Sequence, residues 1–276
     1  MRAVIFDLHT HTTASDGALT PTELVHLAHE HGVDVLAVTD HDTVAGCAEA
    51  MDASEKNLNI VPGIEFSTTW AGRSIHIVGL NVDPENPELL SGVKEQQCAR
   101  DARAREIGRR LTRLGIDDPY HAVSQTAGDA AIGRPHFAAH LVDKGVVKDT
   151  ATAFRKYLGA GKLGDVKLGW AALADVIAWI HAASGVAVLA HPAKYKMTMT
   201  KLRLLAADFV AAGGDGIEVV CGQQTPDVTR RLADVARDLD LAASIGSDFH
   251  HPAQSWSRPG SCGLLPKDLR PVWESW

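Results

Sequence analysis

The chain has 276 residues, of which 45% are hydrophobic, so it can bury one large core or two modest ones. Its formal net charge of -7 argues against a protein that grips duplex nucleic acid through a broad basic surface. No apolar run approaches the roughly 18 residues of a membrane-spanning helix, and the four cysteines are widely spaced, which favours a reducing cytoplasm over a disulfide scaffold.

A strand, a helix and a second strand open the chain. Apolar residues 3–8 predict the first strand, and because no basic stretch precedes it, we expect no signal peptide. A helix is predicted over 21–31, with Thr20 as the N-cap and Glu23 as its capping-box partner. The apolar run 33–39 predicts the second strand.

Strands and helices continue to alternate toward the end of the chain. Such alternation is typical of a parallel sheet covered by helices, which either closes into a barrel or stays open. The remaining predicted strands span 60–64, 74–80, 186–190, 216–220 and 241–247, and the later helices span 171–184, 200–212 and 226–239.

Residues 98–166 interrupt this pattern and differ from it in composition. A long helix is predicted over 87–114, with shorter helical pieces over 135–144 and 150–158. The long helix carries six arginines interleaved with acidic residues, which favours a solvated face over an RNA-guiding surface. We therefore expect residues 98–166 to be a helical insertion that covers the active site. The expected barrel comprises residues 1–97 and 167–276.

Histidines and carboxylates gather at the ends of the predicted strands. The chain has fourteen histidines, and most candidate ligands directly follow a strand, at the end of a barrel where active sites form. His9 and His11 are two residues apart, so both rings point to the same side of an extended segment, and Asp248 and His250 repeat this spacing. The candidate ligands are His9, His11, Asp16, His41, Glu65, His76, His191, Asp248 and His250.

This ligand set indicates catalytic rather than structural metal. Imidazole and carboxylate ligands without a thiolate suit Zn, Mn or Fe. The candidates outnumber the ligands of one ion, so we expect more than one. Clustered divalent ions activate water and neutralise a phosphoryl group in transfer, so no Ser or Cys nucleophile is required.

Four ordered motifs carry a resemblance to a known family. They are DLHTH ending at His11, TDHD around His41, HP at His191 and SDFH ending at His250. Together they resemble the motifs of the polymerase and histidinol phosphatase (PHP) family, over the whole chain outside the insertion. The segments GIEFS around Glu65 and RPHF from Arg134 resemble the TrpH-like subgroup, whose members cleave phosphates of nucleotides and RNA ends.

The resemblance implies an α/β fold, a distorted (β/α)7 TIM-like barrel with the helical insertion domain. It also implies two or three divalent ions, with Mn expected first and Fe or Zn as alternatives. By the same resemblance, one ion is held by His9, His11, Glu65 and Asp248, a second by Glu65, His76 and His191, and a third by Asp16, His41 and His250.

Three residues are candidates for binding substrate. Arg134 precedes Pro135, a favoured first helical residue, so its guanidinium and the helix N-terminus would together face an anion. We expect His136 and Lys194 to reach the same space. The remaining histidines and the late tryptophans are expected to be structural, namely His26, His29, His31, His121, His140, His181, His251, Trp256, Trp273 and Trp276.

We expect a phosphatase acting on a small nucleotide, with the 3'-phosphate of a nucleoside 3',5'-bisphosphate as the leading target. The nearest alternative is a 5'-to-3' exoribonuclease acting on short RNA ends. A cyclic-phosphate hydrolase and a histidinol-phosphate phosphatase follow, the last less favoured because its substrate is small for so large an insertion. A non-catalytic metal-stabilised module and an amidohydrolase are rivals from other classes. Neither a membrane nor duplex nucleic acid is expected as a partner.

Overall fold

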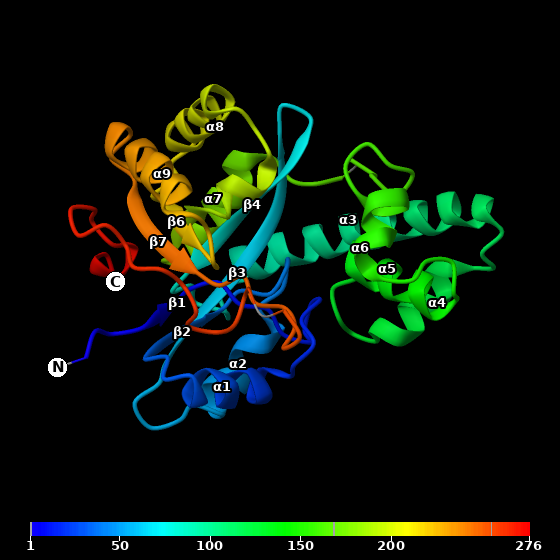
Figure 1. The fold of residues 1–276 in the computed structure, drawn as a ribbon, viewed down its shortest axis with the longest axis horizontal. Helices are drawn as coiled ribbons and strands as arrows, with labels where there is room; N and C mark the ends of the chain where they lie inside the picture. Colours follow the sequence, from blue (N-terminus) through cyan, green and yellow to red (C-terminus); the bar gives the residue numbers. More distant parts are fainter. Residues whose placement is uncertain (1, 168, 255) are drawn as a thin grey trace.

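The computed structural model describes residues 2–167, 169–254 and 256–276. In this part of the chain seven strands form one sheet in chain order, which nearly closes into a barrel (Figure 1). The two sheet edges meet where the amide of Leu8 donates to the carbonyl of Ile245 at 3.0 Å. The strands are β1 Phe6–Asp7, β2 Val35–Val38, β3 Asn59–Trp70, β4 Arg73–Leu80, β5 Val186–Leu189, β6 Gly216–Cys221 and β7 Ala242–Gly246.

The direction of β4 corrects the prediction of a parallel sheet. β4 runs antiparallel to both β3 and β5, and β3 is far longer than the predicted 60–64. Only Ala71 and Gly72, both with positive φ, separate the paired residues Trp70 and Arg73. Two such residues make a hairpin turn, whereas parallel neighbours need a long crossover.

Helices cover the outside of the barrel (Figure 1). The predicted capping box is confirmed: the amide of Glu23 donates to Thr20 Oγ1 at 3.2 Å, and the Glu23 carboxylate accepts from the amide of Thr20 at 2.8 Å. α2 was not predicted, because Val44 at its N-cap offers no side-chain bond. These helices are α1 Pro21–Glu30, α2 Ala45–Asp52, α7 Leu173–Ala182, α8 Met199–Ala211 and α9 Pro226–Asp238.

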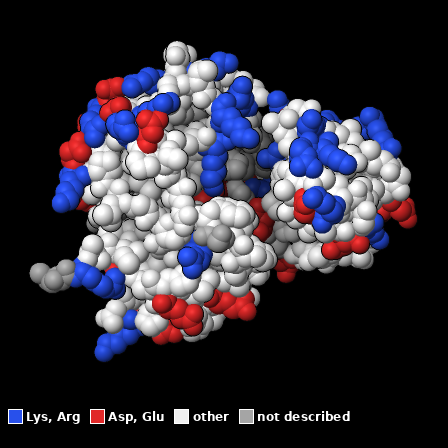
Figure 2. Space-filling view, in the orientation of Figure 1, with Lys and Arg blue, Asp and Glu red and all other residues white. Residues whose placement is uncertain are grey.

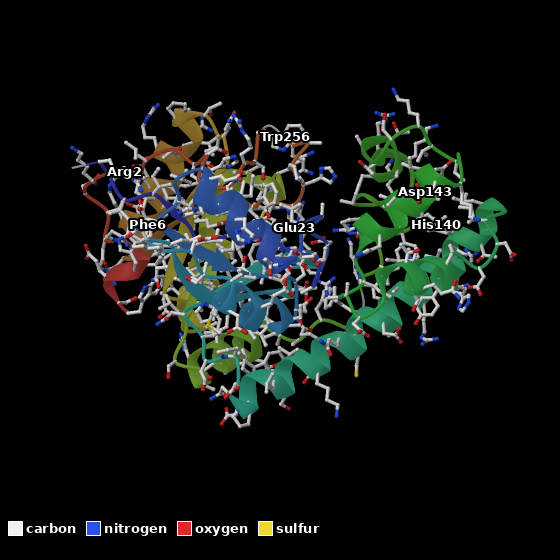
Figure 3. The ribbon with its side chains drawn as sticks, turned by 90° about the horizontal axis from the view of Figure 1, so that it is seen from below. Arg2, Phe6, Glu23, His140, Asp143 and Trp256 are labelled. Atoms are coloured by element: carbon white, nitrogen blue, oxygen red, sulfur yellow. The ribbon has the colours of Figure 1, made fainter. Side chains whose placement is uncertain are left out.

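Between β4 and β5 the chain builds a helical unit beside the barrel. α3 begins against the barrel and runs out into this unit (Figures 1 and 3). A hydrophobic core of its own, which includes Ile107, Phe137 and Leu158, holds the unit together. α4 was missed, although Asp118 and Pro119 form a standard helix start. The elements are α3 Pro87–Leu111, a 3-10 turn Thr112–Leu114, α4 Pro119–Ala127, α5 Arg134–Asp143, α6 Thr150–Ala153 and a π-helical turn Phe154–Leu158.

Short 3-10 turns complete the described structure at Pro192–Tyr195 and Val272–Glu274. Trp273 stacks on Phe6 with ring centroids 3.8 Å apart, as expected of a residue that packs the closing segment. Trp256, by contrast, is 61% exposed, so the packing prediction is wrong for it. Within the described residues, no helix combines the length and apolar character needed to cross a membrane.

Candidate metal centre

The first and last strands bring two pairs of predicted ligands together. The amide of His11 donates to the carbonyl of Phe249 at 2.9 Å, and the amide of Asp248 donates to the carbonyl of His9 at 2.8 Å. These backbone bonds extend the contact of β1 with β7 beyond the strand ends. The side chains that follow the two strands therefore share one end of the barrel.

The antiparallel course of β4 explains how His76 reaches the same end. His76 pairs with Ser67 across the hairpin, and the amide of Ala190 donates to the carbonyl of His76 at 3.1 Å. His191 therefore lies beside His76. In a parallel strand, a residue so near the start would lie at the opposite end of the barrel.

Glu65 occupies the centre of the cluster. Its side chain is completely buried, and its backbone pairs with that of His41 just beyond the end of β2. Ring nitrogens surround its two oxygens at distances of 2.8 Å for His76 and His191, 2.9 Å for His41, and 3.3 Å for His9 and His11.

Two further carboxylates complete the cluster. Asp248 Oδ1 lies 3.3 Å from His11 Nε2 and 3.6 Å from His9 Nε2. Asp16 Oδ1 lies 3.3 Å from His250 Nε2. All nine predicted ligands thus converge on one site.

The donor atoms fit bound cations. Several are buried without a hydrogen-bond partner among the described atoms, including both ring nitrogens of His11, Nε2 of His9 and Oε2 of Glu65. Buried unpaired polar atoms are costly, whereas convergent nitrogen and oxygen atoms are what a divalent ion requires. Ligand atoms within 4.8 Å of one another form four groups: His11, Asp16, His41 and His250; His9, Glu65 and His191; His9, His11 and Asp248; His41, Glu65 and His76.

The four groups of ligand atoms overlap, because several residues belong to more than one group. His9, His11, His41 and Glu65 each belong to two groups. The family resemblance implied Glu65 alone as a shared ligand. The overlap shows that the donor atoms lie close together; of the four shared residues, Glu65 alone has two carboxylate oxygens that could serve neighbouring ions.

The local electrostatics keep the carboxylates ionised. Burial opposes ionisation of Glu65, yet the charges of His41, His76 and His9 hold its pKa well below the usual value. Burial lowers the pKa of His76 to about 4, against the raising effect of Glu65. Burial and the charge of His250 likewise lower the pKa of His11 to about 3. Despite burial, which lowers them, the pKa values of His9, His41 and His250 are instead raised by the facing carboxylates, so metal binding to these rings would displace protons.

Glu218, which the sequence reasoning missed, orients two of the histidines. It is buried in β6, and its Oε1 lies 2.9 Å from His9 Nδ1. Its other oxygen accepts a hydrogen bond from the amide of His191. A carboxylate that fixes the second nitrogen of a ligand histidine sets the ring orientation and tautomer. The signal in the sequence was an acidic residue inside an otherwise apolar strand.

Arginines form the wall that faces this cluster. A cavity of about 400 Å³ is bounded by the ligands on one side and by Arg100, Arg103 and Arg134 on the other. Arg100 and Arg103 are 6% and 7% exposed, and each lies 5.4 Å from the ring centre of Trp170. Burial and the charges of Arg134 and Arg100 lower the pKa of Arg103 to about 9.

The burial of Arg100 and Arg103 corrects the prediction of a solvated face for the arginine-rich helix. That prediction holds for Arg105 and Arg109, which are exposed and pair with Asp101 and Glu106. It is wrong for Arg100 and Arg103. The overlooked signal was spacing, because these two residues continue the stripe of buried side chains on α3 that runs through Leu89, Val93, Gln96, Ile107 and Leu111.

The three predicted substrate residues have different surroundings. Arg134 lines the cavity, and its Nη1 donates to the carbonyl of Leu158 at 3.3 Å. Lys194 also lines the cavity and contacts Asp248 through its Nζ. His136 is not among the described lining residues; its Nδ1 accepts a hydrogen bond from the amide of Gly133 at 3.0 Å, capping its own helix.

The histidines expected to be structural lie outside the ligand groups of the described residues. His26 lies 2.9 Å from Glu55 at the surface, and His181 lies 2.8 Å from Asp215. His140 lies on the insertion, away from the barrel (Figure 3).

Comparison with known proteins places this site in a family. Residues 7–154 match the model of the PHP domain. A 5'-3' exoribonuclease of Haemophilus influenzae is 46% identical over 270 residues, covering 98% of each chain. A 3',5'-nucleoside bisphosphate phosphatase of Chromobacterium violaceum is 44% identical over 269 residues, covering 97% of this chain and 94% of that one.

A solved structure from Chromobacterium violaceum, described as an amidohydrolase with bound sulfate, has the same fold. It is 42% identical, superposes with a TM-score of 0.90, and is matched over 98% of this chain and 95% of its own. Together with the family-model match, these similarities show that the chain belongs to the PHP domain family.

Proposed function

We propose that the chain is a metal-dependent phosphoesterase that removes the 3'-phosphate of nucleoside 3',5'-bisphosphates and leaves the 5'-monophosphate. One observation carries the proposal: a cluster of metal-ligand side chains and three guanidinium groups, two of them buried, face each other across one cavity of about 400 Å³. Such a cavity offers separate sites for two phosphates of one small molecule.

The nine clustered histidines and carboxylates would hold two or three divalent ions, with Mn the leading candidate and Fe or Zn the alternatives. When bound, such ions supply an activated water and neutralise charge on the phosphoryl group. Glu65, shared by two ligand groups, would keep neighbouring ions together. Glu218 holds the ring of His9 in place through Nδ1, which leaves Nε2 for a ligand role.

The arginines would bind the phosphate that does not react. Among the described residues Asp42 forms an ion pair with Arg100, and the Asp165 charge acts on Arg103 and Arg134. The wall keeps a net positive charge, which suits a phosphate monoester of about -1.5 to -2 at neutral pH. Holding this phosphate fixes the reacting one at the metal cluster, and fixed geometry is a large part of phosphoryl-transfer catalysis. Lys194, beside Asp248, adds a positive charge near the reacting group.

Two similarities support this proposal, because relatives 46% and 44% identical are named an exoribonuclease and a 3',5'-nucleoside bisphosphate phosphatase. The amidohydrolase description of the solved structure suits the cavity less well, since an amide substrate has no use for three guanidinium groups. A histidinol-phosphate phosphatase would also leave the anchor site without a second phosphate, whereas a cyclic phosphate that carries a separate phosphate group would fill it.

Exoribonuclease activity from the 5' end of short RNA is a second candidate. Both reactions break the same bond, between phosphorus and the 3'-oxygen of the first nucleotide, and differ only in whether more RNA is attached to that phosphorus. The observation that favours RNA is that the cavity is open toward a larger one between barrel and insertion. A longer substrate has room to leave the metal centre there.

The test is hydrolysis by the Mn-loaded protein of a nucleoside 3',5'-bisphosphate, a nucleoside 3'-monophosphate and a 5'-phosphorylated tetraribonucleotide. We expect the bisphosphate to exceed the monophosphate in kcat/KM by at least about tenfold, because one charge-assisted hydrogen bond is worth about 1.5 to 3 kcal/mol. Asp248→Asn is expected to abolish all three activities. Equal rates on the two small substrates would contradict the anchor site.

We also propose a cytoplasmic location. All four cysteines are free thiols, and Cys47 is buried. Unpaired cysteines are usual in a reducing compartment.

A further inference from the structure

A second cavity continues from the candidate metal centre into the space between barrel and insertion. It measures about 830 Å³ and shares His76, His191, Arg134 and Lys194 with the first cavity. Figure 2 shows a hollow between the two parts of the molecule, with Lys and Arg atoms along its border. A substrate longer than one nucleotide can therefore extend from the reacting centre without crossing a wall.

The walls of this second cavity are basic, although the chain as a whole carries a net charge of -7. Beyond the shared residues it is lined by Arg73 at the tip of the β3–β4 hairpin, Lys196 in the loop after Pro192–Tyr195, and Lys167. Asp165, 3.7 Å from Lys167, is the single carboxylate among the described lining residues. We call this part of the cavity the basic groove.

Arg73 and Lys196 have charges available for a ligand. Both are exposed, and none of the ion pairs formed by described residues involves either side chain. Lys196 has a φ of 51°, a left-handed conformation that lysine rarely adopts. Such a conformation needs support from surrounding structure and is common at binding sites. The tight hairpin turn at Ala71 and Gly72 likewise fixes Arg73.

The alternative path from the metal centre is much less basic. A cavity of about 400 Å³ on the other side of Asp248 is lined by Gln223, Gln254 and Trp256, and Lys194 is the single Lys or Arg among its described lining residues. Backbone phosphates of single-stranded RNA are held chiefly by Lys and Arg along a groove. The charge distribution therefore favours the basic groove.

We propose that the basic groove binds the phosphodiester backbone of RNA on the 3' side of the bond that is cleaved. This inference rests on the second candidate function above. In the reaction, the water oxygen bonds to phosphorus, the bond from phosphorus to the 3'-oxygen of the first nucleotide breaks, and that oxygen takes a proton. The products are a 5'-mononucleotide and RNA shorter by one nucleotide with a 5'-phosphate. The new 5'-phosphate can then occupy the arginine wall in the next round.

The test compares kcat/KM of the Mn-loaded full chain on a nucleoside 3',5'-bisphosphate and on a 5'-phosphorylated tetraribonucleotide. In the double variant Arg73→Gln with Lys196→Gln, we expect the tetranucleotide value to fall about tenfold or more and the bisphosphate value to stay within about twofold. The salt dependence of KM for the tetranucleotide should also weaken, by a slope of about 0.7 for each backbone phosphate that the variant no longer binds. The matched control is Arg230→Gln, which replaces an exposed arginine on α9 and should leave kcat/KM unchanged for both substrates.

Several outcomes would overturn the inference. The first two are an unchanged kcat/KM for the tetranucleotide in the double variant and an equal loss of kcat/KM on both substrates. The third is a loss of kcat/KM for the tetranucleotide alone in Trp256→Ala, which would place the RNA in the other cavity. If the wild type hydrolyses the bisphosphate but not RNA, RNA binding in the basic groove is rejected and the proposed phosphatase function is retained. Failure on both substrates would instead reject the proposed function itself.

Discussion

The carboxylate of Asp42 accepts a hydrogen bond from Arg100 Nε at 2.6 Å, in a buried ion pair that connects the ligand loop of the barrel with the long helix of the insertion. The same carboxylate accepts from the amide of Ser67 at 2.6 Å and from Gln96 Nε2 at 3.2 Å. Asp42 directly follows His41 and has a φ of 52°. One carboxylate therefore fixes both the position of a candidate ligand and the arginine that faces it.

Removal of one partner of this pair should destabilise the protein strongly. Arg100→Ala leaves the Asp42 charge buried without its cation, which typically costs about 3 to 5 kcal/mol in free energy of unfolding. The measurement is denaturant unfolding. The control is Arg105→Ala, whose exposed pair with Asp101 is worth less than about 1 kcal/mol. Similar small losses in the two variants would mean that Asp42 and Arg100 are not coupled in the folded protein.

Glu218→Gln should weaken metal binding without unfolding the barrel. The amide can still accept one hydrogen bond, but its neutral oxygen polarises His9 less than a carboxylate does. Loss of such an outer partner typically lowers metal affinity or activity by about ten- to a hundredfold. Titration of Mn into chelator-stripped protein measures the affinity, and circular dichroism confirms the fold. An affinity equal to that of the wild type would show that Glu218 has a packing role alone.

Metal content should exceed one divalent ion per chain, because the donor atoms form four overlapping groups. Elemental analysis of the active protein gives the number. Stripping the ions should also lower the melting temperature, since a ligand at 100 times its Kd stabilises the folded state by about 2.7 kcal/mol. That corresponds to a shift of roughly 5 to 10 °C for a chain of this size. A fully active preparation with one ion or fewer contradicts the multinuclear site.

Most ligand residues could be predicted from sequence because they follow strands, and strand ends in a barrel meet whatever the exact strand lengths. The error at the two-residue β1 therefore did not displace His9, whereas Glu65 and His76 lie inside β3 and β4 and were found by their residue type and by the family resemblance. Arg100 could not be assigned in the same way. Its spacing on α3 indicates that it is buried, but its position opposite the ligands depends on how the insertion packs on the barrel and on its pairing with the distant Asp42, which no local pattern encodes.

Arg134 is expected to anchor the phosphate that does not react. Its one hydrogen bond to a described residue is to the Leu158 carbonyl, and it faces the metal ligands across the cavity. Removing a charge-assisted hydrogen bond typically costs about 1.5 to 3 kcal/mol, so Arg134→Ala should lower kcat/KM for the bisphosphate by roughly ten- to a hundredfold. Because Arg100 and Arg103 line the same cavity and remain in the variant, we expect the lower end of that range.

Substrate comparison separates anchoring from general damage to the site. A nucleoside 3'-monophosphate lacks the anchored group, so its kcat/KM should change by less than about threefold in Arg134→Ala, whereas the bisphosphate loses about tenfold. Arg155→Ala serves as the matched control, since Arg155 lies on the neighbouring π-helical turn and is not among the described residues that line the cavity. Equal losses on the two substrates would assign Arg134 to the reacting phosphate or to the fold, because only an anchor for the second phosphate makes the loss depend on its presence.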